Sequence, residues 1–66
     1  MVKKGLYKHY KGGYYLVDAV GIHSETGEEV VIYHSEKDKS KVWVRPLSMF
    51  IEEVRAGIKR FEFIKE

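Results

Sequence analysis

Cysteine is absent from this chain of 66 residues, so neither a disulfide nor a thiolate metal site can stabilise it. No apolar stretch approaches the roughly 20 residues that a membrane-spanning helix needs. The N-terminal residues are not followed by an apolar run of the kind that marks a signal peptide. We therefore expect a protein that does not enter a membrane and that is located in the cytoplasm.

A strong charge of either sign is also missing. Twelve basic and ten acidic residues leave a net charge of +2. Proteins dedicated to nucleic acid usually carry a larger positive charge that is concentrated on one face. The charge balance therefore permits a nucleic-acid partner but does not favour one.

The short chain predicts one domain over residues 1–66. A domain of this size buries only about 60% of the surface that its unfolded chain exposes, so its apolar core must supply most of the stability. The hydrophobic content of 44% fits that requirement. We expect a monomer or a weak homo-oligomer.

Short apolar runs separated by glycine-bearing turns predict an all-β protein, a small barrel or roll of about five strands. We expect strands at residues 5–10, 14–23, 28–34, 42–45 and 60–65, and an exposed loop over residues 35–40. Gly21 is the expected site of a bulge. A bulge there or at Gly27 exchanges the two faces of a strand, so the sequence alone leaves the strand register open.

Two structures fit the segment that follows Pro46, the single proline. In the first, a longer helix is predicted because apolar residues recur at helical spacing, at Leu47, Phe50, Ile51, Val54 and Ile58. In the second, one helical turn over Leu47–Ile51 is followed by an extended piece, a turn at Gly57 and the last strand. Small barrels commonly insert a single turn at this point, which favours the second structure.

The strand over residues 42–45 carries the only tryptophan. Residues two apart in a strand share a face, so Trp43 and Arg45 lie on one face and Val42 and Val44 on the other. We expect Trp43 and Arg45 to point away from the core, with the guanidinium lying over the indole ring. Such a surface can contact peptides, bases or acidic groups. The core is then expected to contain Val42, Val44, Leu47 and Phe50.

A structural alternative stays open for the same strand. Trp43 is then covered by the segment Leu47–Ile51, and Arg45 pairs with a glutamate. A basic and aromatic patch near the N-terminus is a further candidate for contacts with phosphates and bases, although it also fits a solvated edge strand. Its residues are Lys3, Lys4, Tyr7, Lys8, Tyr10 and Lys11.

His23 and Glu25 fall at the end of a predicted strand. A histidine and a glutamate can act as acid and base or bind a metal. None of the three histidines has the spacing of a metal site, and no Gly-x-Ser-x-Gly motif is present. A hairpin turn with an exposed imidazole is therefore favoured over an enzyme, and we expect no metal and no cofactor.

Several segments together resemble the signature of the bacterial domain-of-unknown-function family 1653. They are Gly5–Gly12, His23–Thr26, Val31–Tyr33, Trp43–Phe50 and the closing Arg60-Phe61. The resemblance implies a stand-alone SH3-like β-barrel without an assigned activity. It also implies that the family pattern includes His23, Glu25, Tyr33, Trp43 and Arg45.

The chain departs from that family pattern in two places. Residues 34–40 replace a connection that usually carries aromatic residues and glycine. The segment before Arg60 is short and lacks the usual proline.

The residues predict a non-catalytic binding module for an acidic peptide or protein, or for a nucleic acid. Its candidate surface is built on Trp43 and Arg45, with Tyr33, His23 and Glu25 as neighbours. One alternative is an enzyme, or a small-molecule or metal site, in which His23, Glu25 and Arg45 converge around a pocket. Another is a structural subunit of a homo-oligomer that buries Trp43 in a neighbouring copy.

Overall fold

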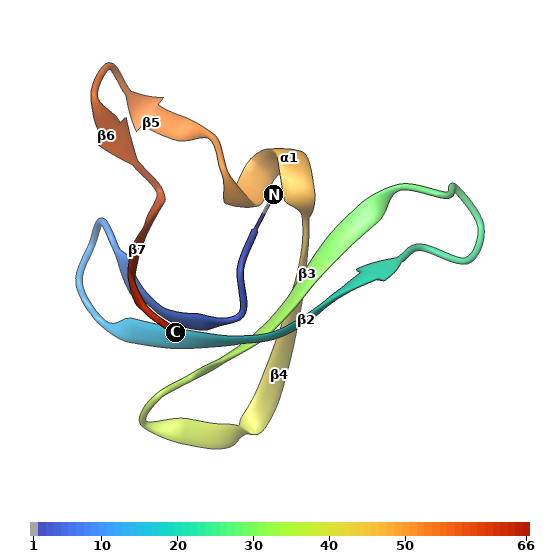
Figure 1. Cartoon of the computed structure of the whole chain (residues 1–66), viewed down its shortest axis with the longest axis horizontal. Coiled ribbons are helices and arrows are strands. Elements are labelled where there is room, and N and C mark those ends of the chain that lie inside the picture. The colour runs from blue at the N-terminus through green and yellow to red at the C-terminus, as the bar shows by residue number, and fades with distance from the viewer. Residues whose placement is uncertain (1) are drawn as a thin grey trace.

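The computed structural model describes residues 2–66 (Figure 1). Four strands come first, β1 (Gly5–His9), β2 (Tyr14–Ile22), β3 (Glu29–Ser35) and β4 (Asp38–Pro46). The helical turn α1 (Leu47–Phe50) follows, and then β5 (Glu53–Arg55), β6 (Ile58–Lys59) and β7 (Phe61–Lys65). The main sheet is antiparallel and five-stranded, in the order β4-β3-β2-β1-β7, while β5 and β6 form a separate two-stranded hairpin.

The prediction of an all-β protein is confirmed. The five expected strands correspond to the five strands of the main sheet, and β5 and β6 are additional. After Pro46 the chain makes one helical turn and then becomes extended, so the longer helix is not formed. Between residues 2 and 66, no helix is long and apolar enough to cross a membrane.

The bulge in β2 lies at Asp18 and not at Gly21, so that prediction was wrong. The pairing with β3 shifts between Val17 and Ala19, whereas Gly21 pairs regularly with Val30. The Asp18 carboxylate lies 2.7 Å from Nδ1 of the His34 ring, a contact between the extra residue and the neighbouring strand β3. Because a bulge bends its strand, β2 and β3 curve together around one side of the molecule (Figure 1).

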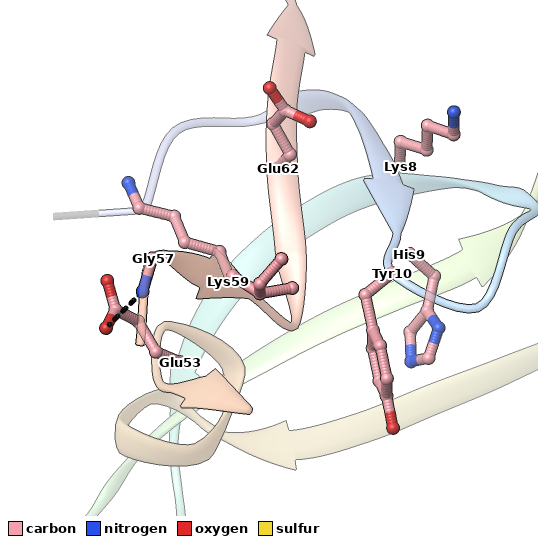
Figure 2. A pocket seen from close by; sticks show the side chains of 8 residues that line it. Lys8, His9, Tyr10, Glu53, Gly57, Lys59 and Glu62 are labelled. Atoms are coloured by element: carbon pink, nitrogen blue, oxygen red, sulfur yellow. Dashed lines mark hydrogen bonds between the residues drawn. The ribbon is translucent and has the colours of Figure 1, made fainter. Parts of the chain in front are cut away.

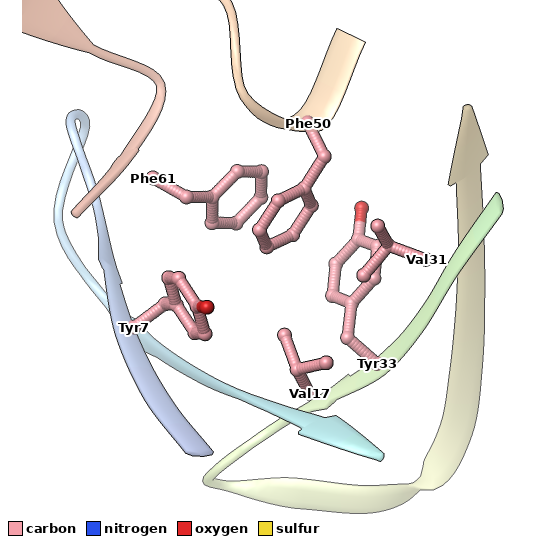
Figure 3. Packing of buried hydrophobic residues seen from close by; sticks show 6 residues of the cluster. All are labelled: Tyr7, Val17, Val31, Tyr33, Phe50 and Phe61. Atoms are coloured by element: carbon pink, nitrogen blue, oxygen red, sulfur yellow. The ribbon is translucent and has the colours of Figure 1, made fainter. Parts of the chain in front are cut away.

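The core fills the concave side of this curved sheet. Figure 3 shows the Phe50 ring of α1 meeting side chains that point inward from the sheet, with the Phe61 ring of β7 beside it. Phe50 and Phe61 are stacked, with ring centroids 4.1 Å apart and planes only 6° from parallel. Tyr7 meets Phe50 edge to face at 5.3 Å, a favoured geometry for aromatic pairs. The buried cluster consists of Tyr7, Val17, Val31, Tyr33, Phe50 and Phe61.

The prediction that Val42 and Val44 build the core was wrong, because the two side chains are 59% and 62% exposed. In β4, Trp43 pairs with Tyr33 and Arg45 pairs with Val31. Directly paired residues of neighbouring strands point to the same face of a sheet. Since Tyr33 and Val31 are core residues, Trp43 and Arg45 lie on the core side and the valines point outward.

The other two predicted core residues do lie in the interior. Phe50 is only 1% exposed, and Leu47 is partly buried against the cluster. Both come from α1, which lies over the open side of the curved sheet (Figure 1).

The expected loop over residues 35–40 was also wrong. Ser35 pairs with Asp38, so only Glu36 and Lys37 make the turn, and β4 begins at Asp38. The polar residues that suggested a loop instead form the first part of an edge strand. Lysine is common on such edges because its charge discourages pairing with other sheets.

Candidate functional site

A cavity of about 200 Å³ lies on the core side of β4. Each strand of the main sheet supplies at least one of the side chains around it. We call it the aromatic cavity, and it is lined by His9, Tyr15, Tyr33, Trp43, Arg45 and Phe61.

The inner wall of the aromatic cavity is continuous with the core. Tyr33 and Phe61 are both core residues, with ring centroids 5.4 Å apart. Tyr15 meets each of these rings edge to face at 5.7 Å. Trp43, by contrast, is 50% exposed, so the cavity has a packed wall on one side and an accessible indole on the other.

Arg45 supplies the positive charge of the aromatic cavity. Its Nε–H donates a hydrogen bond to the Tyr33 hydroxyl at 3.3 Å. Among residues 2–66, no acidic side chain forms an ion pair with it. The guanidinium therefore stays available to an external anion, and the predicted pairing of Arg45 with a glutamate is not formed in the described part of the chain.

The predicted stacking of Arg45 on Trp43 is not observed either. Within the described residues, the cation–π contacts are made by Lys3 over Phe63 and by Lys11 over Tyr10. The Tyr33 hydroxyl orients the guanidinium instead.

His9 adds a second hydrogen-bond donor. Its Nδ1 accepts the Lys11 backbone N–H at 3.1 Å, so the neutral ring carries its proton on Nε2. Burial lowers the pKa of His9 below its usual 6.5, and the charges of Arg45, Arg60 and Lys11 lower it further. The imidazole is therefore neutral near pH 7 and can donate from Nε2.

Together these groups favour an anionic ligand. The lining side chains carry three kinds of donor, guanidinium, imidazole Nε2–H and indole N–H, and the lining residues that the structure describes include no carboxylate. Rings and donors combined suit a carboxylate that is attached to an apolar or extended group.

The lowered pKa of His9 predicts a pH dependence of folding. The unfolded chain takes up a proton at the ordinary pKa, whereas the folded chain resists it, so stability falls as the pH drops below about 6.5 and levels off below the folded-state pKa. We expect wild type to lose more stability between about pH 7.5 and pH 5 than His9→Gln does. Urea unfolding of the two proteins across this range measures the difference, and equal losses would contradict the assignment.

His23 and Glu25 lie elsewhere, in the hairpin between β2 and β3. Nδ1 of His23 accepts the backbone N–H of Glu25 at 3.1 Å, as expected for a capped turn. This hairpin joins β3 at Glu29, and Tyr33 lies four residues farther along the strand, a separation of about 13 Å. The structure therefore brings together Trp43, Arg45 and Tyr33 but neither His23 nor Glu25, and the convergence that an enzyme or metal site at these residues requires is not present.

Sequence reasoning missed three residues of the aromatic cavity, namely His9, Tyr15 and Phe61. His9 lies opposite Phe61 because β1 pairs with β7, which joins the two ends of the chain. The one local signal was alternation, since Tyr7 and His9 are two apart in a strand and share its inner face.

The N-terminal basic and aromatic patch is weaker than its sequence suggested. Tyr7 is buried, and its hydroxyl donates to the Lys3 carbonyl at 2.7 Å. It is therefore not free to stack on a base, which leaves Tyr10 as the exposed ring of that patch.

A larger cavity of about 440 Å³ lies between the end of β1 and the β5–β6 hairpin (Figure 2). Its charges are mixed, with Lys8 and Lys59 alongside Glu53 and Glu62. The Glu53 carboxylate already accepts the Gly57 backbone N–H at 3.3 Å. Because positive and negative side chains line the same open cavity, it does not favour a ligand of either charge. We therefore take the smaller aromatic cavity as the candidate site.

The fold and the cavity together describe a small all-β protein in which an arginine lies among the aromatic side chains of a cavity. The pattern of the family described as "Protein of unknown function (DUF1653)" matches residues 5–63. The chain belongs to this family, as its sequence resemblance predicted. It is also similar to the protein in a crystal structure of a DUF1653 member from Bordetella bronchiseptica, with 31% identity and a TM-score of 0.83 over 96% of this chain and 87% of that chain. No curated protein matches it.

Proposed function

We propose that the chain is a non-catalytic binding module whose aromatic cavity accepts a carboxylate of an acidic peptide or protein segment. The observation that carries the proposal is Arg45, which is oriented by the Tyr33 hydroxyl and has no acidic partner among residues 2–66. A charge-assisted hydrogen bond between guanidinium and carboxylate is about twice as strong as a neutral one. Trp43 beside it offers apolar area to the rest of the ligand.

An acidic segment is favoured over a nucleic acid. A nucleic-acid site neutralises several phosphates and usually places aromatic rings for bases to stack on. Here one guanidinium and a neutral His9 face the cavity, Tyr7 is buried, and the net charge is only +2. These groups match one carboxylate better than a row of phosphates.

The emission of Trp43 tests the proposal directly, because it is the only tryptophan and lines the aromatic cavity. The probe is an acetylated and amidated octapeptide of alternating valine and glutamate. We expect it to change the emission saturably, and the matched peptide of valine and glutamine to bind at least about tenfold more weakly, since it loses a charged hydrogen bond. Equal affinities for the two peptides would contradict the proposal.

Arg45→Gln should weaken binding of the glutamate peptide by about ten- to hundredfold, the value of one charged hydrogen bond. Arg55→Gln is the matched control, because Arg55 is an exposed arginine of β5 that lines no part of the aromatic cavity. It should leave the affinity unchanged. Tighter binding of a thymidine oligonucleotide than of the peptide, with a steep salt dependence, would point to nucleic acid instead.

A further inference from the structure

Among residues 2–66, β4 pairs with β3 on one side only, which makes it a free edge of the main sheet. Three consecutive large apolar side chains of this edge are exposed, namely Val42, Trp43 and Val44. Edge strands usually avoid such a run, because it is a template for pairing with another strand. The exception therefore marks a surface suited to strand addition.

The hydrogen-bond pattern shows which backbone groups of β3 point toward β4. At one end of β3, the Glu36 N–H donates to the Tyr14 carbonyl of β2 at 2.9 Å. At the other end, the His23 N–H donates to the Glu28 carbonyl at 2.8 Å. Alternate residues of an antiparallel strand bond to opposite neighbours, so even-numbered residues of β3 bond to β2 and odd-numbered ones bond to β4.

It follows which groups of β4 face outward. Trp43 and Arg45 pair with odd-numbered residues of β3, so their backbone groups are used within the sheet. Val42 and Val44 direct their N–H and C=O groups to the free edge. Pro46 has the same orientation as Val44, and its missing N–H would have pointed outward, which is where proline is tolerated in a sheet.

From this edge we infer that the acidic segment binds as an added antiparallel β-strand along β4, hydrogen-bonded to Val42 and Val44. This inference rests on the proposed function and specifies its ligand. Side chains of an added strand alternate between the two faces. Those on the core side reach Arg45 and Trp43, and those on the outer side cover the two valines. The ligand is therefore an extended segment in which acidic and apolar residues alternate.

Charge selects an acidic partner over a second copy of this chain. Lys41 comes directly before Val42, where the regular pairing with β3 begins. In a two-fold antiparallel pairing of two copies about Trp43, Lys41 of one copy would therefore lie near Arg45 of the other, and like charges brought together are destabilising. An acidic strand would instead bring its carboxylates close to these two positive charges. The charged side chains of β4 are Asp38, Lys39, Lys41 and Arg45.

Amide hydrogen exchange, followed by NMR on the full chain with the valine–glutamate octapeptide, tests the added strand. The amides of Val42 and Val44 should exchange quickly in the free protein and at least about tenfold more slowly in the complex. The amides of Trp43 and Arg45 should be protected in both states, because they bond to β3. Unchanged exchange at Val42 and Val44 under saturating peptide would overturn the inference.

Backbone N-methylation of the peptide gives a second, independent result. Peptide valines lie opposite Val42 and Val44 and use their amides on β4, whereas the glutamate amides face solvent. Methylating the valine amides should weaken binding at least about tenfold, and methylating the glutamate amides should have little effect. Equal effects of the two modifications would overturn the added strand.

The two proposals fail in different ways. One outcome is that binding requires Arg45, while methylation of the valine and of the glutamate amides has equal effects and the exchange of the Val42 and Val44 amides is unchanged. In that case the strand addition is wrong and the proposed function stands. If the glutamate and glutamine peptides bind alike, the proposed function is wrong as well. A free protein that sediments as a dimer, with Val42 and Val44 already protected, would assign the edge to a second copy and overturn the inference.

Discussion

Phe50→Ala is expected to unfold a large share of the protein at room temperature. Phe50 is 1% exposed, stacks on Phe61, and meets Tyr7 and Tyr33 edge to face. Removing a buried phenylalanine ring costs about 3–5 kcal/mol. A core of this size rarely supplies more than about 3–5 kcal/mol in total, so the loss removes most of the stability. Urea unfolding followed by circular dichroism measures it.

Met49→Ala is the matched control, because Met49 is the neighbouring residue of the same helical turn and is 42% exposed. It should change the free energy of unfolding by no more than about 0.5 kcal/mol. A Phe50→Ala protein that keeps its folded spectrum and loses less than about 1 kcal/mol would show that the ring stack is not the centre of the core.

Gly5→Ala is expected to have the next largest effect. Gly5 has φ +139°, where other residues are strained by about 1–3 kcal/mol. A Cβ there would also lie against the Lys65 carbonyl oxygen and 2.9 Å from the Glu66 Cα, both of them backbone atoms. Because β1 pairs with β7 at this point, relief of the clash disturbs the pairing of the chain ends. We expect a loss of about 2–4 kcal/mol in urea unfolding.

Gly57→Ala separates backbone strain from the clash. Gly57 has φ +80°, and a Cβ there would have nothing within 4 Å. It should cost only the strain of the left-handed conformation, about 1–2 kcal/mol. If both variants lose the same free energy of unfolding, the close approach of Gly5 to Lys65 and Glu66 contributes nothing to the effect of Gly5→Ala.

The strands were predictable because their signals are local. β-branched and aromatic runs, the glycine turns and Pro46 gave the five strands of the main sheet, apart from the start of β4, and the single helical turn, and the family resemblance agreed with them. The closer description as an SH3-like barrel stays a prediction.

The faces of β4 were not predictable from the strand itself. Alternation separates Val42 and Val44 from Trp43 and Arg45, but it does not say which pair points inward. That choice depends on Tyr33, which is buried and sets the face of Trp43 through the β3–β4 register. Valine was expected inside because it is apolar, but on this edge strand the described residues leave both valines more than half exposed.

The site was predictable only in part for a related reason. Trp43, Arg45 and Tyr33 lie on two neighbouring strands that are adjacent in sequence, and they do come together. His9 and Phe61 join them through the pairing of β1 with β7, which strand alternation alone does not predict. His23 and Glu25 lie in a turn at the far end of β3.

The central claim is that the Arg45 guanidinium contacts a carboxylate of the bound segment. A double-mutant cycle tests it most directly, with wild type and Arg45→Gln each titrated with the glutamate peptide and the glutamine peptide. Groups in direct contact show a coupling energy of about 0.5–3 kcal/mol, and a charged pair belongs in the upper part of that range. We predict at least about 1 kcal/mol. Additive losses, with a coupling energy near zero, would contradict the contact and with it the proposed function.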